Sequence, residues 1–302
     1  MQLELISKDF AQRAVSPFLE LGAYESLWDE QSASFKSIAS LFSKQVGSIP
    51  SDFVESSRAL SYANDVHGLL RDAGVLNYGV RVHGAGDYPE RLRIADHPVE
   101  LLYFQGWWEL VNSPRSVAVV GTRKPSNEGV ARTRKLVKSL LQDDFTIVSG
   151  LATGIDTAAH MMAIEQGGRT IAVLGTPLSR AYPPINAKLQ TEIAQHHLLI
   201  SQVPVKRYGN QKDPTSNNFF FPERNITMSA LTDATIIVEA GDTSGTLVQA
   251  RHALKQGRKV FILDSNFHNL ALKWPHKLEE RGAIRVADYD DIRRRLLPVT
   301  TH

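Results

Sequence analysis

Residues 145–160 read FTIVSGLATGIDTAAH, an apolar run followed by a glycine-rich turn and by a segment that can form a helix. The run Phe145–Val148 is short and apolar throughout, which is typical of a strand buried on both faces. We expect a helix over residues 155–166, so the turn joins the end of a strand to the beginning of a helix. Strand, turn and helix in this order form the repeating unit of a parallel sheet.

The same unit recurs along the second part of the chain, where short apolar runs alternate with helical segments. Such alternation predicts a parallel sheet with helices on both faces. We therefore predict an α/β fold, a Rossmann-like doubly wound and mostly parallel sheet, with a small N-terminal helical module. The further strands are expected at Val117–Val120, Thr170–Leu174, Leu198–Ile200, Ala234–Val238 and Lys259–Leu263, and the further helices over 127–141, 186–196, 223–231 and 245–256.

Four regions are distinguished along the chain. Residues 18–27 and 53–70 place apolar side chains at helical spacing, which indicates helices before the sheet begins. The apolar run 99–106 follows Pro98 and predicts an edge strand. The regions are a helical module over 1–75, a bridging extension over 76–112, a Rossmann-like domain over 113–296 and a tail over 297–302.

Composition excludes several classes of site. The 302 residues include no cysteine, so disulfides, zinc-thiolate sites and cysteine nucleophiles are excluded. The N-terminal stretch MQLELISKDF lacks the pattern of a secretory signal, and no apolar run approaches the roughly 20 residues that span a bilayer. We expect a cytoplasmic protein that does not contact membranes.

Basic residues are concentrated in one segment although the net charge is only +2. Residues 113–140 contain seven Lys or Arg residues and the single acidic residue Glu128. An excess of this size can mark the contact surface for a polyanion, or it can be the solvated face of a helix. Both interpretations remain open at this point.

Three glycine-rich turns follow expected strands, with the sequences GTRKPS at 121–126, SGLATGID at 149–156 and EAGDTSGT at 239–246. Glycine lets backbone amides approach an anion closely, and the positive end of a helix dipole attracts it. The carboxyl ends of parallel strands lie at one edge of a sheet, so the three turns are expected to meet there. Arg123 and Lys124 add cations to the first turn. None of the turns has the spacing of a dinucleotide or Walker-type phosphate loop.

A long connection without helical or strand periodicity is expected over residues 202–221. It contains Lys206, Arg207, Tyr208 and Lys212, and it ends in the triplet FFF at 219–221. Basic residues interleaved with aromatic ones suit nucleic acid, because bases stack on rings and cations pair with phosphates. The alternative is that the phenylalanines anchor the next helix in the core.

The chain resembles the DprA/Smf family of DNA-processing proteins over roughly residues 76–290. Five motifs carry the resemblance, in the same order as in the family. They are GTR at 121–123, SGLATGID at 149–156 followed by Ala159-His160, YP at 182–183 with Asn186, FPERN at 221–225, and SGTL at 244–247 with Ala250-Arg251.

The resemblance implies a protein that binds single-stranded DNA and catalyses no reaction. It implies a role in natural transformation and DNA recombination, in which the protein protects the strand and loads a RecA-type recombinase. It also implies a homodimer, and we expect neither a cofactor nor a metal. The residues expected to contact DNA phosphates are Gly121, Thr122, Arg123, Lys124, Ser126, Ser149, Gly150, Gly154, Arg224, Asn225, Ser244, Gly245 and Thr246.

The sequence departs from the family pattern at four places around the expected ligand site. Ile226 follows the FPERN motif where the family usually has a second arginine, and Pro177, Ser179 and Gln202 replace other motif residues. These changes indicate a divergent member. The host process, whether transformation, a mobile element or phage defence, is left open by the sequence.

Two other functions are compatible with the same fold. A nucleoside-monophosphate phosphoribohydrolase of the LOG family needs a glutamate in the helix after its Gly-Thr turn, and Gln249 stands at that position. An amide cannot act as a general base, which disfavours the hydrolase. A non-catalytic, nucleotide-sensing module of the same superfamily is the second alternative.

Titratable residues near the turns have both structural and chemical interpretations. Asp156 and His160 could form an acid–base pair or part of a metal site, but a helix cap and a core histidine are favoured. The pair His196-His197 lies at a helix end, where cationic side chains are common. Glu239 and Asp242 are interpreted as turn-capping residues.

Overall fold

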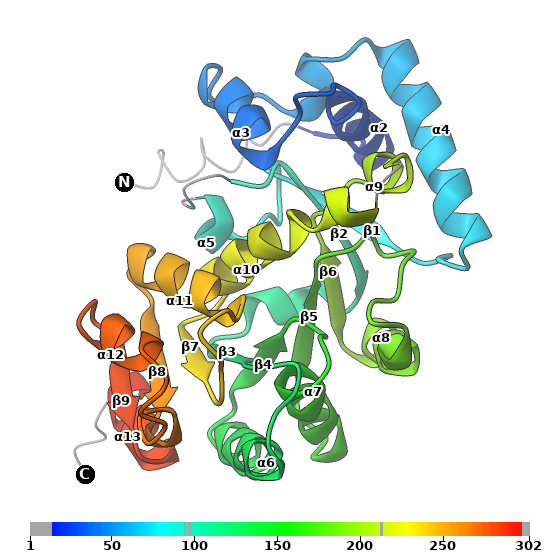
Figure 1. Cartoon of the computed structure of the whole chain (residues 1–302). Helices are drawn as coiled ribbons and strands as arrows, with labels where there is room; N and C mark the ends of the chain where they lie inside the picture. The colour runs from blue at the N-terminus through cyan, green and yellow to red at the C-terminus, as the bar shows by residue number, and fades with distance from the viewer. Residues whose placement is uncertain (1–13, 94, 96–97, 212–213, 298–302) are drawn as a thin grey trace, which may run out of the picture. The chain divides into compact units, whose positions relative to one another are not determined.

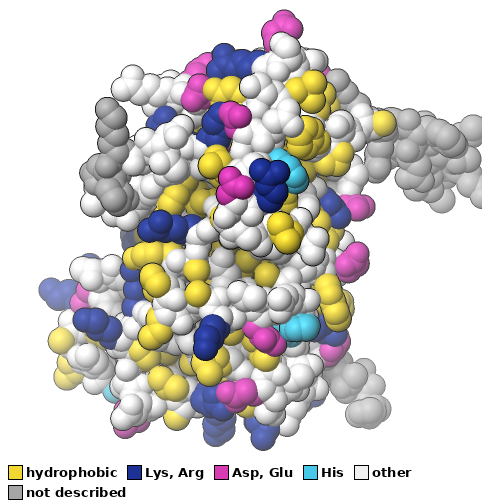
Figure 2. All heavy atoms as spheres, turned by 90° about the vertical axis from the view of Figure 1, so that its right-hand side faces the viewer, with side chains coloured by type: hydrophobic (Ala, Val, Ile, Leu, Met, Phe, Trp, Pro, Cys, Tyr) yellow, Lys and Arg dark blue, Asp and Glu magenta, His cyan; other side chains and the backbone are white. Residues whose placement is uncertain are grey.

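A computed structural model describes residues 14–93, 95, 98–211 and 214–297 (Figure 1 and Figure 2). The chain divides into two compact units. Unit 1 comprises Met1–Phe104, Pro177–Arg180 and Ser201–Asn217, and unit 2 comprises Gln105–Thr176, Ala181–Ile200 and Asn218–His302.

Unit 2 contains the alternating strands and helices that the apolar runs predict. The strands are β3 (Ser116–Val120), β4 (Thr146–Ser149), β5 (Thr170–Leu174), β6 (Leu198–Ser201), β7 (Ala234–Ile237), β8 (Lys259–Leu263) and β9 (Ile284–Val286). The helices are α6 (Asn127–Gln142), α7 (Ile155–Glu165), α8 (Ala187–His196), α10 (Phe220–Leu231), α11 (Thr246–Lys255), α12 (Trp274–Glu279) and α13 (Tyr289–Leu296). Every expected strand and helix of this region is confirmed, whereas β9, α12 and α13 were not predicted.

The strand order in unit 2 is β6-β5-β4-β3-β7-β8-β9. β3 pairs in parallel with both β4 and β7, and the pairs β4–β5, β7–β8 and β8–β9 are parallel as well. The chain therefore runs outward from β3 to β6 and returns to β7 on the other side of β3. This reversal confirms a doubly wound sheet, and it places a topological switch point between β3 and β7, where such folds bind ligands.

Both faces of this sheet are covered. Val117 and Val119 of β3 pack with Leu136 and Leu140 of α6 and with Ala159 of α7 in one core cluster. Successive residues of a strand point to opposite faces, so the intervening residues of β3 face the other side. Figure 1 shows α10 and α11 on that side. Burial on both faces explains why the strands read as continuous apolar runs.

Unit 1 contains the helices that the first 75 residues predict, and an antiparallel pair of strands. Its described elements are α2 (Pro17–Leu27), α3 (Phe35–Ser43), α4 (Ser56–Asp72), β1 (Gly79–Val82), α5 (Glu90–Arg93), β2 (Leu101–Gly106, which ends in unit 2) and α9 (Val205–Gly209). The register of the pair joins Gly79 to Phe104 and Val82 to Leu101. β2 matches the strand expected after Pro98, and β1 was not predicted.

The segment 202–221 differs from the irregular connection expected there. It contains α9, a short 3-10 helix (Pro214–Asn217) and the beginning of α10. The buried carboxylate of Glu25 accepts hydrogen bonds from the amides of Val205 (2.6 Å) and Lys206 (3.1 Å) at the start of α9. A side chain about 180 residues away in the sequence therefore stabilises this turn of helix.

The basic side chains of this segment make contacts within unit 1. Lys206 pairs with Asp65 (2.5 Å), and the guanidinium of Arg207 donates to the carbonyls of Glu30 and Gln31. Lys212 lies outside the described residues.

The core interpretation of the phenylalanine triplet is observed for one of its residues, and the nucleic-acid interpretation stays a prediction. Phe220 is fully buried in unit 2 and anchors α10, as the core alternative proposed. Phe221 is only partly buried, so part of its side chain is accessible.

Gly22 of α2 marks the closest approach of two helices in unit 1. A Cβ atom at this position would lie 1.8 Å from the carbonyl oxygen of Ala59 in α4. We expect Gly22→Ala to destabilise the protein by at least about 1–3 kcal/mol, because the two backbones must separate. Urea unfolding followed by circular dichroism measures the change.

Gly68 of α4 supplies the matched control, since a Cβ there meets no atom within 4 Å. Gly68→Ala in this helix interior is expected to stabilise by about 0.5–1 kcal/mol. Equal effects of the Gly22 and Gly68 substitutions would contradict the close contact.

Candidate nucleic-acid interface

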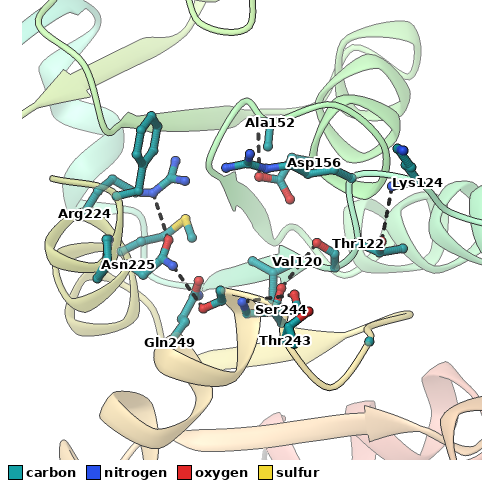
Figure 3. Close-up of a pocket in the computed structure, with 18 of the residues that line it drawn as sticks. Val120, Thr122, Lys124, Ala152, Asp156, Arg224, Asn225, Thr243, Ser244 and Gln249 are labelled. Atoms are coloured by element: carbon teal, nitrogen blue, oxygen red, sulfur yellow. Dashed lines mark hydrogen bonds between the residues drawn. The ribbon is translucent and has the colours of Figure 1, made fainter. Parts of the chain in front are cut away.

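A cavity of about 630 Å³ lies in unit 2 at the carboxyl ends of β3 and β7. The three glycine-rich turns and the N-terminal part of α10 surround it. Figure 3 shows side chains of these four segments pointing toward a common space. The expected convergence of the turns at one edge of the sheet is therefore observed. This convergence includes α10, whose FPERN motif is 100 residues from the first turn.

Hydrogen bonds with the third turn hold the backbone of the first turn in place, and the cations of the first turn remain exposed. The amide of Thr122 donates to the carbonyl of Glu239 (2.7 Å), and the hydroxyl of Thr246 donates to the carbonyl of Gly121 (3.3 Å). Arg123 and Lys124 are exposed, and neither forms an ion pair with a residue that the structure describes. Both cations are thus available to an anion at the cavity.

Unlike the two cations of the first turn, Ser126 is held in hydrogen bonds within the protein. Its hydroxyl donates to Glu239 (2.7 Å) and accepts from the amide of Gly129 (2.9 Å), so it caps α6. The Glu239 carboxylate also accepts from the amide of Ser126 (2.9 Å) and from Arg132 (3.3 Å). These bonds confirm a capping role for Glu239, which joins the first turn to the third.

The second turn is organised around Asp156 at the start of α7. Its carboxylate accepts hydrogen bonds from the amides of Gly150 (3.2 Å) and Ala152 (3.3 Å), the latter drawn in Figure 3. Burial raises the pKa of Asp156 above its usual value. Because the amides of Gly150 and Ala152 donate to Asp156, the turn's own carboxylate sets the conformation of this wall of the cavity.

Gly154 closes this turn where another residue would not fit. It has φ = +83°, and a Cβ would lie 2.4 Å from the carbonyl oxygen of Thr122. Ser149 is fully buried, and its hydroxyl donates to the carbonyl of Val119 (2.7 Å). The first and second turns are therefore packed directly against each other.

Arg224 is a buried cation at the centre of the site. Its Nη1 donates to the carbonyls of Gly150 (2.5 Å) and Val173 (2.6 Å), and its Nε donates to Asn225 Oδ1 (2.9 Å). Burial lowers the pKa of Arg224 to about 10, and the charge of Asp156 opposes this effect. The guanidinium remains charged at neutral pH and joins the second turn to the end of β5.

The third turn is joined to the same network by amide groups. Asn225 Nδ2 donates to the carbonyl of Gly245 (3.2 Å), and the amide of Thr246 donates to the hydroxyl of Ser244 (3.2 Å). Gln249 is almost fully buried, and its Nε2 donates to the hydroxyl of Thr235 (3.3 Å). The position that a phosphoribohydrolase fills with a carboxylate therefore holds an amide bonded to β7.

His160 belongs to the core and does not pair with Asp156. Its Nδ1 lies 2.7 Å from the hydroxyl of Thr170, and its side chain is fully buried. Within the described part of the chain, no three His, Cys, Asp or Glu side chains are grouped so that they could hold a metal. The core interpretation of His160 is confirmed.

Tyr182, quoted only as part of a motif, and Phe221 of the FFF triplet add a ring surface to the cavity. The rings of Tyr182 and Phe221 have centroids 5.3 Å apart, and the guanidinium of Arg123 lies 5.9 Å from the Phe221 ring. Tyr182 is 41% exposed. The alternation of cation and ring suits a ligand that carries both phosphates and bases.

The family described as DNA recombination-mediator protein A matches residues 79–297, which include all three turns and α10. This chain belongs to the DprA/Smf family. It is a DNA-processing protein of the DprA type. The resemblance seen in the motifs is confirmed.

DprA proteins are similar to this chain in both sequence and structure. The DNA processing protein DprA of Streptococcus pneumoniae is 39% identical over 206 residues, which cover 68% of this chain and 70% of the relative. The crystal structure of the S. pneumoniae protein covers 95% of this chain and 100% of its own, with a TM-score of 0.70 and 27% identity. DNA processing protein A of Helicobacter pylori, studied for its single-stranded DNA binding mode, covers 73% of this chain and 95% of its own, with a TM-score of 0.61 and 29% identity.

Among the helices of the described residues, none has the length and apolar character needed to cross a membrane.

Proposed function

We propose that the cavity of unit 2 binds the phosphate backbone of single-stranded DNA. The observation that carries this proposal is the placement of Arg123, exposed and free of ion pairs with described residues, beside the ring of Phe221. Lys124 extends the positive charge to the margin of the cavity. Rings stack on every base and cations pair with every phosphate, so this combination favours single strands of any sequence.

The family supports the proposed ligand. The H. pylori relative has a single-stranded DNA binding mode, and its structure matches this chain at 29% identity. We extend this property to the present protein. We further propose that it acts in the cytoplasm, protects single strands during transformation or recombination, and loads a RecA-type recombinase onto them.

We propose that the site binds without catalysis. Two carboxylates near the cavity, Asp156 and Glu239, already accept hydrogen bonds from backbone amides. Gln249, which has no acid–base function, stands at the glutamate position of the related hydrolases. Incubation with nucleoside monophosphates is expected to release no base. Base release without oligonucleotide binding would instead favour the hydrolase.

Arg123→Ala is the direct test of the binding site. We expect the affinity for single-stranded oligonucleotides to fall about tenfold, because a charge-assisted hydrogen bond to phosphate is lost. The loss should be the same for different base sequences, since phosphate contacts carry no sequence information. Fluorescence anisotropy at several salt concentrations measures the affinity and its salt dependence.

Arg281→Ala removes another exposed arginine and serves as the control. Its affinity should match that of the wild type. The binding site would be wrong if Arg123→Ala bound as tightly as Arg281→Ala.

The recombinase partner and the homodimer rest on membership of the family. Light scattering at micromolar concentration is expected to give the mass of a dimer, and a monomer mass would remove this part of the proposal. Co-precipitation with a purified RecA-type recombinase tests the other part.

A further inference from the structure

α6 leads from the DNA site to a basic surface that the cavity does not use. Its buried face is formed by Gly129, Thr133, Leu136, Val137 and Leu140. Side chains on a helix repeat every 3.6 residues, so Ala131, Lys135, Lys138 and Gln142 lie on the opposite face, and all four are exposed.

The cations of this helix fall into two classes. Arg132 pairs with Glu239 and Arg134 pairs with Glu165 (2.5 Å), so both are neutralised by acids of neighbouring elements. Lys135 and Lys138 form no ion pair with any residue that the structure describes. The cations of residues 113–140 that form no ion pair with a described residue are therefore found in the first turn and on the outer face of α6, apart from Arg115, which precedes β3 and donates to the carbonyl of Asp143.

The two basic regions lie on neighbouring segments of the chain. α6 begins at Asn127, directly after the turn that holds Arg123 and Lys124. Figure 3 shows Lys124 at the margin of the cavity opposite Arg224 and Asn225. With a rise of about 1.5 Å per residue, Lys135 lies about 12 Å along the axis from the start of α6.

We infer that single-stranded DNA leaves the cavity past Lys124 and continues over the outer face of α6, where Lys135 and Lys138 contact its phosphates. This inference rests on the proposed function of the cavity, and it extends the interface beyond the three turns. Between the two basic regions the exposed residues are Ser126, Asn127, Glu128 and Ala131, none of them bulky. Glu128 is the one acid in this stretch of the helix, and it would repel the strand.

The test compares two lengths of oligonucleotide, because only the longer one can reach α6. A strand of about 2 nucleotides, which spans about 7 Å at about 3.4 Å per nucleotide, stays within the cavity, and a strand of about 16 extends past Lys135, at the upper end of the site sizes known for single-strand binders. We expect Lys135→Gln/Lys138→Gln to leave the affinity for the short strand unchanged. For the long strand the affinity should fall about tenfold, and the slope of log K against log salt should decrease by about 1.4.

Lys277→Gln/Arg281→Gln on and beside α12 removes the same charge from exposed positions elsewhere and is the matched control. Glu128→Gln is expected to tighten binding of the long strand alone, which a loss of stability could not produce. Equal long-strand affinity in the α6 variant and the wild type, or an equal loss in the control, would overturn the inference. If the proposed function itself is wrong, the result differs: the wild type does not bind the short strand, or Arg123→Ala binds the short strand with unchanged affinity.

Discussion

Arg224→Met is expected to destabilise the protein by about 3–5 kcal/mol. The substitution leaves the buried carboxylate of Asp156 without its neighbouring cation, and it leaves the carbonyls of Gly150 and Val173 without their donor. Arg224 and Asp156, both described residues, form no direct ion pair, but the loss of one of two buried opposite charges, together with the donor to two buried carbonyls, costs this much because the remaining groups stay buried and uncompensated. The midpoint of urea unfolding, measured at neutral pH, gives the change.

A second substitution separates the charge from the packing. Asp156→Asn in the Arg224→Met background removes the uncompensated charge, so the double variant should be more stable than Arg224→Met alone. Arg123→Met, at an exposed position, should change the stability by less than about 0.5 kcal/mol. A loss of stability below about 1 kcal/mol for Arg224→Met would show that Arg224 does not hold the second turn in place.

The structural role of Arg224 has a consequence for DNA binding. The FPERN motif identifies Arg224 as a phosphate contact by resemblance, whereas its guanidinium donates to the protein's own carbonyls and to Asn225. The guanidinium joins the second turn, β5 and, through Asn225, the third turn. Arg224 can therefore support DNA binding by positioning these turns while Arg123 contacts the phosphate.

The fold of unit 2 was predictable because its strands are buried on both faces. Runs such as Val117–Val120 and Val260–Leu263 are apolar throughout, and amphipathic helices separate them. β1 and β9 were missed because an arginine interrupts each of these runs, Arg81 in β1 and Arg285 in β9, and both strands have partly exposed positions. α9 was missed because its stability depends on Glu25, which no local pattern connects with residue 205.

The positions of the candidate site were predictable and its internal contacts were not. Glycine-rich turns after parallel strands indicate where an anion can bind, and the three turns do surround one cavity. The side chains that already occupy their amides, Asp156 for the second turn and Glu239 for the first, are determined by packing in three dimensions. The sequence alone therefore could not separate the exposed Arg123 from the buried Arg224 or the capping Ser126.

Acidification is expected to destabilise the protein through His160. Burial is the main cause that lowers the pKa of His160 to about 3, and the charges of His197 and Arg224 lower it further. In the unfolded chain the pKa of histidine is about 6.5, so the unfolded state binds the proton more readily. The contribution of neutral His160 to the free energy of unfolding is complete above pH 6.5, and it is lost as the pH falls from 6.5 toward 3. Linkage gives a loss of about 2 kcal/mol between pH 7.5 and pH 5.

Comparison with His160→Gln isolates this effect from other titrating groups. The raised pKa of Asp156 acts in the opposite direction, since a buried acid that binds a proton stabilises the folded state at low pH. Glutamine is not protonated in this range, so the stability of His160→Gln relative to the wild type should rise by about 2 kcal/mol between pH 7.5 and pH 5. His197→Gln, at a half-buried position, should show a smaller rise. Urea unfolding of the three proteins at both pH values measures the differences, and parallel pH profiles for wild type and His160→Gln would show that His160 does not stay neutral in the fold.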